Sequence, residues 1–131
     1  MNFPKELRYT KTHEWARREG DKITVGITDY AQKEISDVVF VELPKIEQNV
    51  VAEKAVAVVE SVKAAFDIYA PVSGKVTRLN KDLESTPALV NQDCYGAGWF
   101  FEMYLSNPDA GEWEALMSAE EYEKNLKKPI G

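Results

Sequence analysis

A lysine between two predicted β-strands is the residue of this chain best placed to do chemistry. Lys63 follows the apolar run 55–59 and precedes residues 66–69, in which apolar and polar side chains alternate. A hairpin between these runs is expected to present the amine of Lys63 to solvent, away from the surface of the protein itself. The small side chains of Ala64 and Ala65 leave room for another molecule to approach. Most lysines at hairpin tips are only solvated charges, so the neighbouring residues must decide whether this amine is an attachment point.

Two other residues could act as a nucleophile, base or metal ligand, but each stands alone. Cys94 is the only cysteine and His13 the only histidine. One cysteine excludes an internal disulfide and a cysteine-based zinc site. A nucleophilic Cys94–His13 pair would need a surrounding hydrolase signature, which the sequence lacks, so we expect His13 to be structural. We expect no catalytic residue and no metal site, and the chain is not predicted to be an enzyme.

Composition restricts the class of protein. The chain has 131 residues, 44% of them hydrophobic, which predicts one globular domain over residues 1–131. A net charge of −6, from 16 basic and 22 acidic residues, opposes nucleic-acid binding. The longest apolar runs are too short to cross a bilayer, so we expect no membrane association. The N-terminus resembles neither a signal peptide nor a transit peptide, which predicts a cytoplasmic protein or the mature form of a mitochondrial one.

The elements that must position Lys63 are mostly short strands. Alternating and β-branched residues predict a hairpin over 9–27, and helical spacing after Thr28 or Asp29 predicts a short helix to residue 35. Further strands are expected at 38–43, 74–79 and 99–105, with irregular or short helical structure over 80–90.

The C-terminal part changes to helical patterns. Asn107 and Pro108 open a predicted helix that continues through Leu116. Ser118 and Glu121 form a predicted capping box for a second helix that ends near residue 126. The sequence therefore predicts a mainly β fold, a β-sandwich or flattened barrel with short helices and a helical C-terminus.

Seven segments, in order along the chain, resemble the H protein of the glycine cleavage system. They are YTKTHEW at 9–15, VGITDYAQ at 25–32, VFVELP at 39–44, VVESVKAA at 58–65, PVSG at 71–74, GW at 98–99 and SAEEY at 118–122. The resemblance spans nearly the full length and implies a lipoyl-domain-like fold. It also implies that lipoic acid is attached as an amide to the side chain of Lys63.

The resemblance assigns roles to the residues around this lysine. Four of them would form the motif that a lipoylating enzyme recognises: Glu60, Ser61, Val62 and Ala64. Three more are candidate contacts of the lipoyl arm. Glu14 would pair with the ammonium group of a loaded arm, with Thr12 nearby and Asp67 as a weaker candidate. Without the resemblance, Glu14 would be an exposed strand carboxylate.

The resemblance also implies partners. The arm would carry an aminomethyl group from glycine decarboxylase (P protein), which uses pyridoxal phosphate, to the tetrahydrofolate-dependent aminomethyltransferase (T protein). Dihydrolipoyl dehydrogenase (L protein) would then reoxidise the arm. The H protein itself would be a carrier rather than an enzyme, and its tether would raise the local concentration of the group it carries.

Two alternatives share the lysine hairpin. Biotinyl carriers and acyltransferase lipoyl domains typically have Met-Lys-Met or Asp-Lys-Ala at the tip, and Val62-Lys63-Ala64 differs from both. An H-like protein that relays lipoyl groups to other enzymes, or serves another pathway, remains open.

The chain departs from the family at five positions. Glycine is common near Glu47, at Glu53 and at Ala57, proline is common at Cys94, and a small polar residue is common at Phe66. The missing glycines predict a slightly different backbone path into the hairpin, and Phe66 could change arm packing or partner choice.

Overall fold

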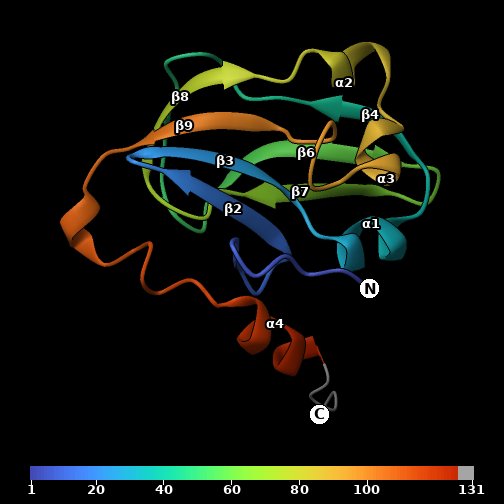
Figure 1. Ribbon diagram of the computed structural model, residues 1–131. Helices are drawn as coiled ribbons and strands as arrows, with labels where there is room; N and C mark the ends of the chain where they lie inside the picture. Colours follow the sequence, from blue (N-terminus) through green and yellow to red (C-terminus); the bar gives the residue numbers. More distant parts are fainter. Residues whose placement is uncertain (127–131) are drawn as a thin grey trace.

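The computed structural model describes residues 1–126, which form two antiparallel β-sheets and several short helices (Figure 1). The larger sheet has the strand order β1-β2-β3-β9-β8-β5, and the smaller sheet has the order β4-β6-β7. The strands of the larger sheet are β1 (Arg8–Tyr9), β2 (Glu14–Glu19), β3 (Lys22–Ile27), β9 (Phe101–Leu105), β8 (Gly74–Leu79) and β5 (Asn49–Val50). Those of the smaller sheet are β4 (Val38–Glu42), β6 (Ala55–Ser61) and β7 (Ala65–Tyr69). The predicted mainly β fold is confirmed, as two separate sheets rather than a closed barrel.

The core lies between the sheets and is built by the inward side chains of facing strands. In the larger sheet, Ile23 of β3 lies opposite Met103 of β9, and both residues are fully buried. The smaller sheet contributes Val59 of β6 and Ile68 of β7, which belong to the same apolar cluster. Because alternate residues of a strand point to opposite faces, these two strands leave their other residues for solvent or for partners.

Short helices close the ends of the sandwich. The helix α1 (Asp29–Ile35) begins where predicted, since the Thr28 hydroxyl accepts a hydrogen bond from the backbone N–H of Ala31. In Figure 1, α1 lies beside the end at which β6 turns into β7. The segment expected to be irregular or short helix contains two single-turn helices, α2 (Asp82–Ser85) and α3 (Leu89–Gln92).

The C-terminal helix α4 (Ala119–Leu126) is confirmed together with its capping box. The backbone N–H of Glu121 donates to the Ser118 hydroxyl, and the backbone N–H of Ser118 donates back to the Glu121 carboxylate. The hydrogen bond from the Ser118 backbone lowers the pKa of Glu121 below its ordinary value. A second apolar cluster attaches α4 to the larger sheet, with the ring of Tyr122 stacked on Tyr9 at a centroid distance of 4.9 Å.

The helix predicted from Asn107 to Leu116 is wrong. Only a 3-10 turn, η1 (Pro108–Ala110), forms there. Gly111 follows it with a left-handed φ of 84°, which ends the turn because helical residues need a negative φ. The carboxylate of Glu112 then accepts hydrogen bonds from the backbone N–H and the hydroxyl of Ser73, so this segment is tied to the start of β8.

Two of the departures from the family lie where the backbone conformation favours glycine. Glu47 has a φ of 70° and Glu53 a φ of 69°, both in the left-handed region that favours glycine. Glutamate therefore occupies the conformation for which glycine is suited. The third position, Ala57, lies in β6 next to a register irregularity between Ala55 and Ala57.

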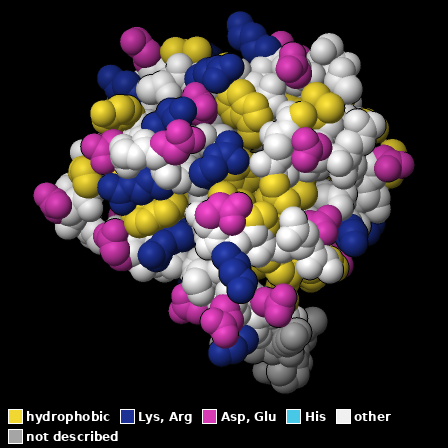
Figure 2. Space-filling model, viewed as in Figure 1, with side chains coloured by type: hydrophobic (Ala, Val, Ile, Leu, Met, Phe, Trp, Pro, Cys, Tyr) yellow, Lys and Arg dark blue, Asp and Glu magenta, His cyan; other side chains and the backbone are white. Residues whose placement is uncertain are grey.

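The surface carries both signs of charge. On the face shown in Figure 2, acidic and basic side chains are interspersed over the sandwich and over α4. No helix within residues 1–126 is both long enough and apolar enough to span a membrane.

Candidate functional site

The tip of the β6–β7 hairpin holds Lys63, as predicted, and Ser61 shapes it. The Ser61 hydroxyl accepts hydrogen bonds from the backbone N–H of Lys63 at 3.1 Å and of Ala64 at 3.3 Å. The backbone N–H of Ser61 donates to the Ala64 carbonyl at 2.9 Å, which closes the turn. The N–H of Val62 donates to the carbonyl of Asp37 and so fixes the tip to the segment before β4. Lys63 is therefore displayed on a braced turn.

The amine of Lys63 was expected to point away from the protein, and this expectation is wrong. Its Nζ donates to the backbone carbonyl of Glu34, 3.0 Å away, although the residue remains exposed. Glu34 lies in the last turn of α1, where helix carbonyls lack an intrahelical partner and carry the negative end of the helix dipole. The helix end thus directs the lysine side chain across the gap between the hairpin and α1.

A cavity of about 290 Å³ opens in this gap, and we call it the hairpin cavity. One wall comes from α1 and one from β6 and β7. The end comes from residues 10–13 between β1 and β2, which we call the β1–β2 segment, and from Ile27 of β3. It is lined by Thr12, His13, Ile27, Tyr30, Ala31, Glu34, Ile35, Val59, Phe66, Asp67 and Ile68. Most of these side chains are apolar or aromatic, while Thr12, His13 and the two acidic residues supply polar groups.

Glu14 is buried rather than exposed, which corrects the simple expectation for a strand carboxylate. Its side chain is 1% exposed. One carboxylate oxygen accepts from the hydroxyls of Thr10 and Thr12, each at 2.5 Å, and the other accepts from the backbone N–H of Tyr69 at 3.1 Å. Burial raises the pKa of Glu14, and these hydrogen bonds oppose the rise. Glu14 therefore links the β1–β2 segment to the end of β7, and Thr12, whose hydroxyl donates to this carboxylate, also lines the hairpin cavity.

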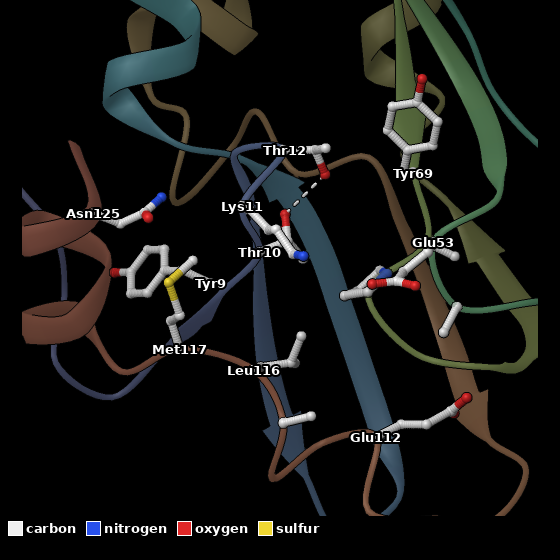
Figure 3. Close-up of a pocket in the computed structure, with 14 residues that line it drawn as sticks. Tyr9, Thr10, Lys11, Thr12, Glu53, Tyr69, Glu112, Leu116, Met117 and Asn125 are labelled. Atoms are coloured by element: carbon white, nitrogen blue, oxygen red, sulfur yellow. Dashed lines mark hydrogen bonds between the residues drawn. The ribbon is translucent and has the colours of Figure 1, made fainter. Parts of the chain in front are cut away.

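Thr12 also lines a larger cavity, of about 730 Å³ (Figure 3). In Figure 3, Tyr9, Met117 and Asn125 face Tyr69 and Glu53 across this space. Thr12 lines both cavities, and its hydroxyl lies 3.2 Å from that of Thr10. The buried carboxylate of Glu14 is therefore hydrogen-bonded to a residue that lines both cavities.

His13 stands at the end of the hairpin cavity in a fixed orientation. It has a left-handed φ of 77°, and its Nδ1 lies 2.7 Å from the hydroxyl of Tyr122. That hydroxyl also lies 2.8 Å from the Thr28 hydroxyl, so α4, α1 and the β1–β2 segment meet at one hydrogen-bonded group. Burial lowers the pKa of His13, while the charge of Glu34 raises it. The sequence suggested a structural role for His13, which this contact supports, but gave no signal that Tyr122 would reach it.

The other predicted site residues divide between the two faces of the hairpin. Glu60 is exposed and lies between Phe40 of β4 and Ala65 of β7. Val62 is 65% exposed at the tip. Asp67 is exposed, lies opposite Val58 and borders the hairpin cavity. Sequence reasoning missed Tyr30 and Glu34 as site residues, because only the packing of α1 against the hairpin brings Glu34 to Lys63 and Tyr30 to the hairpin cavity.

Cys94 stands where the family commonly has proline, and it is not one of the residues that line the hairpin cavity. Its backbone carbonyl accepts a hydrogen bond from the indole N–H of Trp15 at 2.9 Å. The side chain is buried, and burial raises the pKa of the thiol to about 12. The thiolate is therefore scarcely populated at neutral pH.

Comparison with known proteins gives a consistent result. The family model described as glycine cleavage H-protein matches residues 7–129. A glycine cleavage system H protein of Thermus thermophilus is 55% identical over 127 residues, covering 97% of this chain and 98% of its own. That of Psychrobacter cryohalolentis is 52% identical over 126 residues, covering 95% of this chain and 98% of its own.

A solved structure agrees with the sequence comparisons. The crystal structure of a glycine cleavage system H protein from Mycobacterium marinum superposes with a TM-score of 0.87 at 32% identity, covering 96% of this chain and 100% of that chain. The family match over residues 7–129 includes both sheets and the Lys63 hairpin. The chain therefore belongs to the glycine cleavage H-protein family.

Proposed function

We propose that this protein is the lipoyl carrier of a glycine cleavage system, with lipoic acid attached to Lys63. The lipoylated lysine takes an aminomethyl group from glycine decarboxylase to aminomethyltransferase, and dihydrolipoyl dehydrogenase reoxidises it. Bond-making belongs to these partners and to the arm, and the chain acts as a tether and shelter. The family and the full-length matches support this assignment.

The observation that carries the proposal is the position of the Lys63 amine. It stands on a braced turn, is exposed, and lies at the end of α1 beside the hairpin cavity. An ammonium group has three N–H donors, and the amide formed by lipoylation keeps one. That one N–H is enough to donate to the Glu34 carbonyl. The hydrogen bond that directs the Lys63 side chain toward α1 is therefore compatible with lipoylation.

The residues of the hairpin cavity fit a lipoyl group. Such a group, when bound, supplies a disulfide in a five-membered ring on an apolar chain, which opens to a thiol and a substituted sulfur. Ile35, Val59 and Ile68 give the cavity apolar walls suited to the chain, and burial of that apolar surface would favour the docked arm. Sulfur atoms also contact aromatic rings favourably, and Tyr30 and Phe66 border the cavity.

Thr12 and Glu14 form the polar end of this shelter. The Thr12 hydroxyl donates to Glu14, which leaves its oxygen lone pairs able to accept from a cation in the cavity. The negative charge of Glu14 would be felt through this hydroxyl without Glu14 leaving its buried position. If Glu14→Gln released ammonia from an arm loaded by glycine and glycine decarboxylase no faster than the parent protein, this protective role would be excluded.

Partners have a distinct surface to recognise. Val62 is exposed at the tip of the hairpin, and Glu60 is exposed opposite Phe40 of β4, on the face that points away from the core. We infer that lipoylating enzymes read the side chains of Glu60 and Val62, while Ser61 acts indirectly by holding the turn. Lys54 and Lys75, which lie near the same hairpin in sequence, lack these neighbours.

Intact mass tests the attachment site. The purified protein and its Lys63→Arg variant are incubated with lipoate ligase, lipoate and ATP, and their masses are compared. We expect one lipoyl increment on the parent protein and none on the variant. An increment that persists in Lys63→Arg would refute the assignment, and reconstitution with the three partner enzymes would separate glycine cleavage from a lipoyl relay.

A further inference from the structure

One aromatic side chain that lines the hairpin cavity, Phe66, does not belong to the attachment motif around Lys63. Phe66 follows Lys63 by three residues, borders the cavity and is 37% exposed. We propose that Phe66 positions the lipoyl arm by covering its sulfur-bearing end inside the hairpin cavity. This inference rests on the function proposed above and adds a residue that the attachment motif and the arm contacts do not include.

The orientation of Phe66 follows from the register of the hairpin. Phe66 of β7 lies opposite Val59 of β6, and Ile68 is two residues further along the same strand. Val59 and Ile68 are 1% and 4% exposed, so they face the core. Residues two apart in a strand, and residues directly opposite in a sheet, share a face. The ring of Phe66 is therefore on the inner face, at the end of the sandwich beside α1, where the hairpin cavity lies.

The opposite wall determines what passes beneath this ring. It consists of four residues of α1: Tyr30, Ala31, Glu34 and Ile35. The Lys63 amine donates to the Glu34 carbonyl on the same helix. An arm that starts there and enters the cavity must run between α1 and the inner face of β7, where Phe66 stands.

The chemistry of the arm suits an aromatic cover. Sulfur atoms make favourable contacts with aromatic rings, and a ring excludes water from apolar chains beside it. A small polar side chain at this position would do neither. We therefore expect Phe66 to keep the arm in the cavity for a larger fraction of time and to limit the access of small reagents to its sulfur atoms.

The test measures that access directly. The protein is lipoylated, reduced, and alkylated with iodoacetamide under pseudo-first-order conditions, with the rate followed by intact mass. Cys94 contributes little background, because it is the only cysteine, is buried, and has a thiol pKa raised to about 12. Phe66→Ser should increase the alkylation rate about five-fold, the effect expected from losing one sulfur–aromatic contact and the apolar cover. Phe66→Leu, which keeps an apolar cover, should restore part of the protection.

A matched control comes from the same sheet. Phe40 of β4 is 51% exposed and lies opposite Glu60, the neighbour of Val59, so it occupies the outer face. Phe40→Ser should leave the alkylation rate unchanged. Equal rates for Phe66→Ser and the parent protein, or an equal increase in Phe40→Ser, would overturn the proposal.

Failure of the role proposed for Phe66 can be told apart from failure of the lipoyl-carrier function. If the parent protein accepts no lipoyl group, the function proposed above is refuted before any rate is measured. If all variants are lipoylated and have similar unfolding midpoints in urea, a difference in rate reports on the covering of the arm alone.

Discussion

Replacing Glu14 should affect stability in a way that depends on both the substitute and the pH. Glu14→Ala leaves the backbone N–H of Tyr69 without its acceptor and removes two hydroxyl hydrogen bonds. An unsatisfied buried N–H costs about 1–3 kcal/mol and each neutral hydrogen bond contributes about 1 kcal/mol, although the threonine hydroxyls can turn toward water. We expect Glu14→Ala to lower the free energy of unfolding by about 2–4 kcal/mol. Glu14→Gln keeps an acceptor for Tyr69 and should cost about 1 kcal/mol or less at low pH.

The pH dependence has a definite sign. Burial raises the pKa of Glu14 above its ordinary value of 4.5, so the folded state holds this proton more tightly than the unfolded chain does. The corresponding stabilisation is complete below the ordinary pKa and is lost as pH rises through the raised value. Glutamine does not titrate, so Glu14→Gln should gain stability relative to the parent protein as pH rises from below 4.5 toward neutrality.

Urea unfolding of the parent protein and both variants, at several pH values across this window, measures these differences. The reasoning would be refuted by a parent–glutamine difference that stays constant with pH. An unfolding midpoint of Glu14→Ala equal to that of the parent protein would likewise show that the three hydrogen bonds contribute nothing.

Two further predictions concern the approach to the hairpin and its tip. Glu53→Gly should raise the free energy of unfolding by about 0.5–1 kcal/mol, because relief of the left-handed φ exceeds the entropy cost of glycine. Urea unfolding measures this, with Glu42→Gly in β4 as a destabilising control. A Glu53→Gly protein that is less stable than the parent protein would contradict the prediction. Ser61→Ala should slow lipoylation of Lys63 about three- to ten-fold, because the N–H groups of Lys63 and Ala64 lose the hydroxyl that fixes the turn. Initial rates from intact mass test it against Ser61→Thr, which keeps a hydroxyl, and an unchanged rate in Ser61→Ala would show that the turn does not need that hydroxyl.

Local signals in the sequence were sufficient for the elements that depend on neighbours in the chain. The Lys63 hairpin follows from two strand patterns with a short connection, and α4 follows from Ser118 and Glu121, whose capping box needs only a spacing of three residues. The helix expected before it failed at Gly111, whose left-handed φ ends the turn and could not be distinguished in advance from a tolerated helical glycine.

The site was less predictable, because its geometry joins residues far apart in the chain. Glu14 becomes a buried link only when Tyr69, 55 positions later, supplies its backbone N–H. The Lys63 amine reaches the carbonyl of Glu34, 29 positions earlier, and a backbone carbonyl leaves no trace in the sequence. Side-chain identity predicted which residue carries the amine, whereas tertiary packing decides where that amine points.

The most direct test of the carrier role is carbon dioxide release from carboxyl-labelled glycine by purified glycine decarboxylase. Lipoylated parent protein should support release of close to one equivalent per lipoyl group when the other two partners are absent, and continued turnover when they are added. Lys63→Arg protein, taken through the same lipoylation procedure, should support none. Release that is as large with Lys63→Arg as with the parent protein, or no release with a parent protein shown by mass to be fully lipoylated, would contradict the role proposed for Lys63.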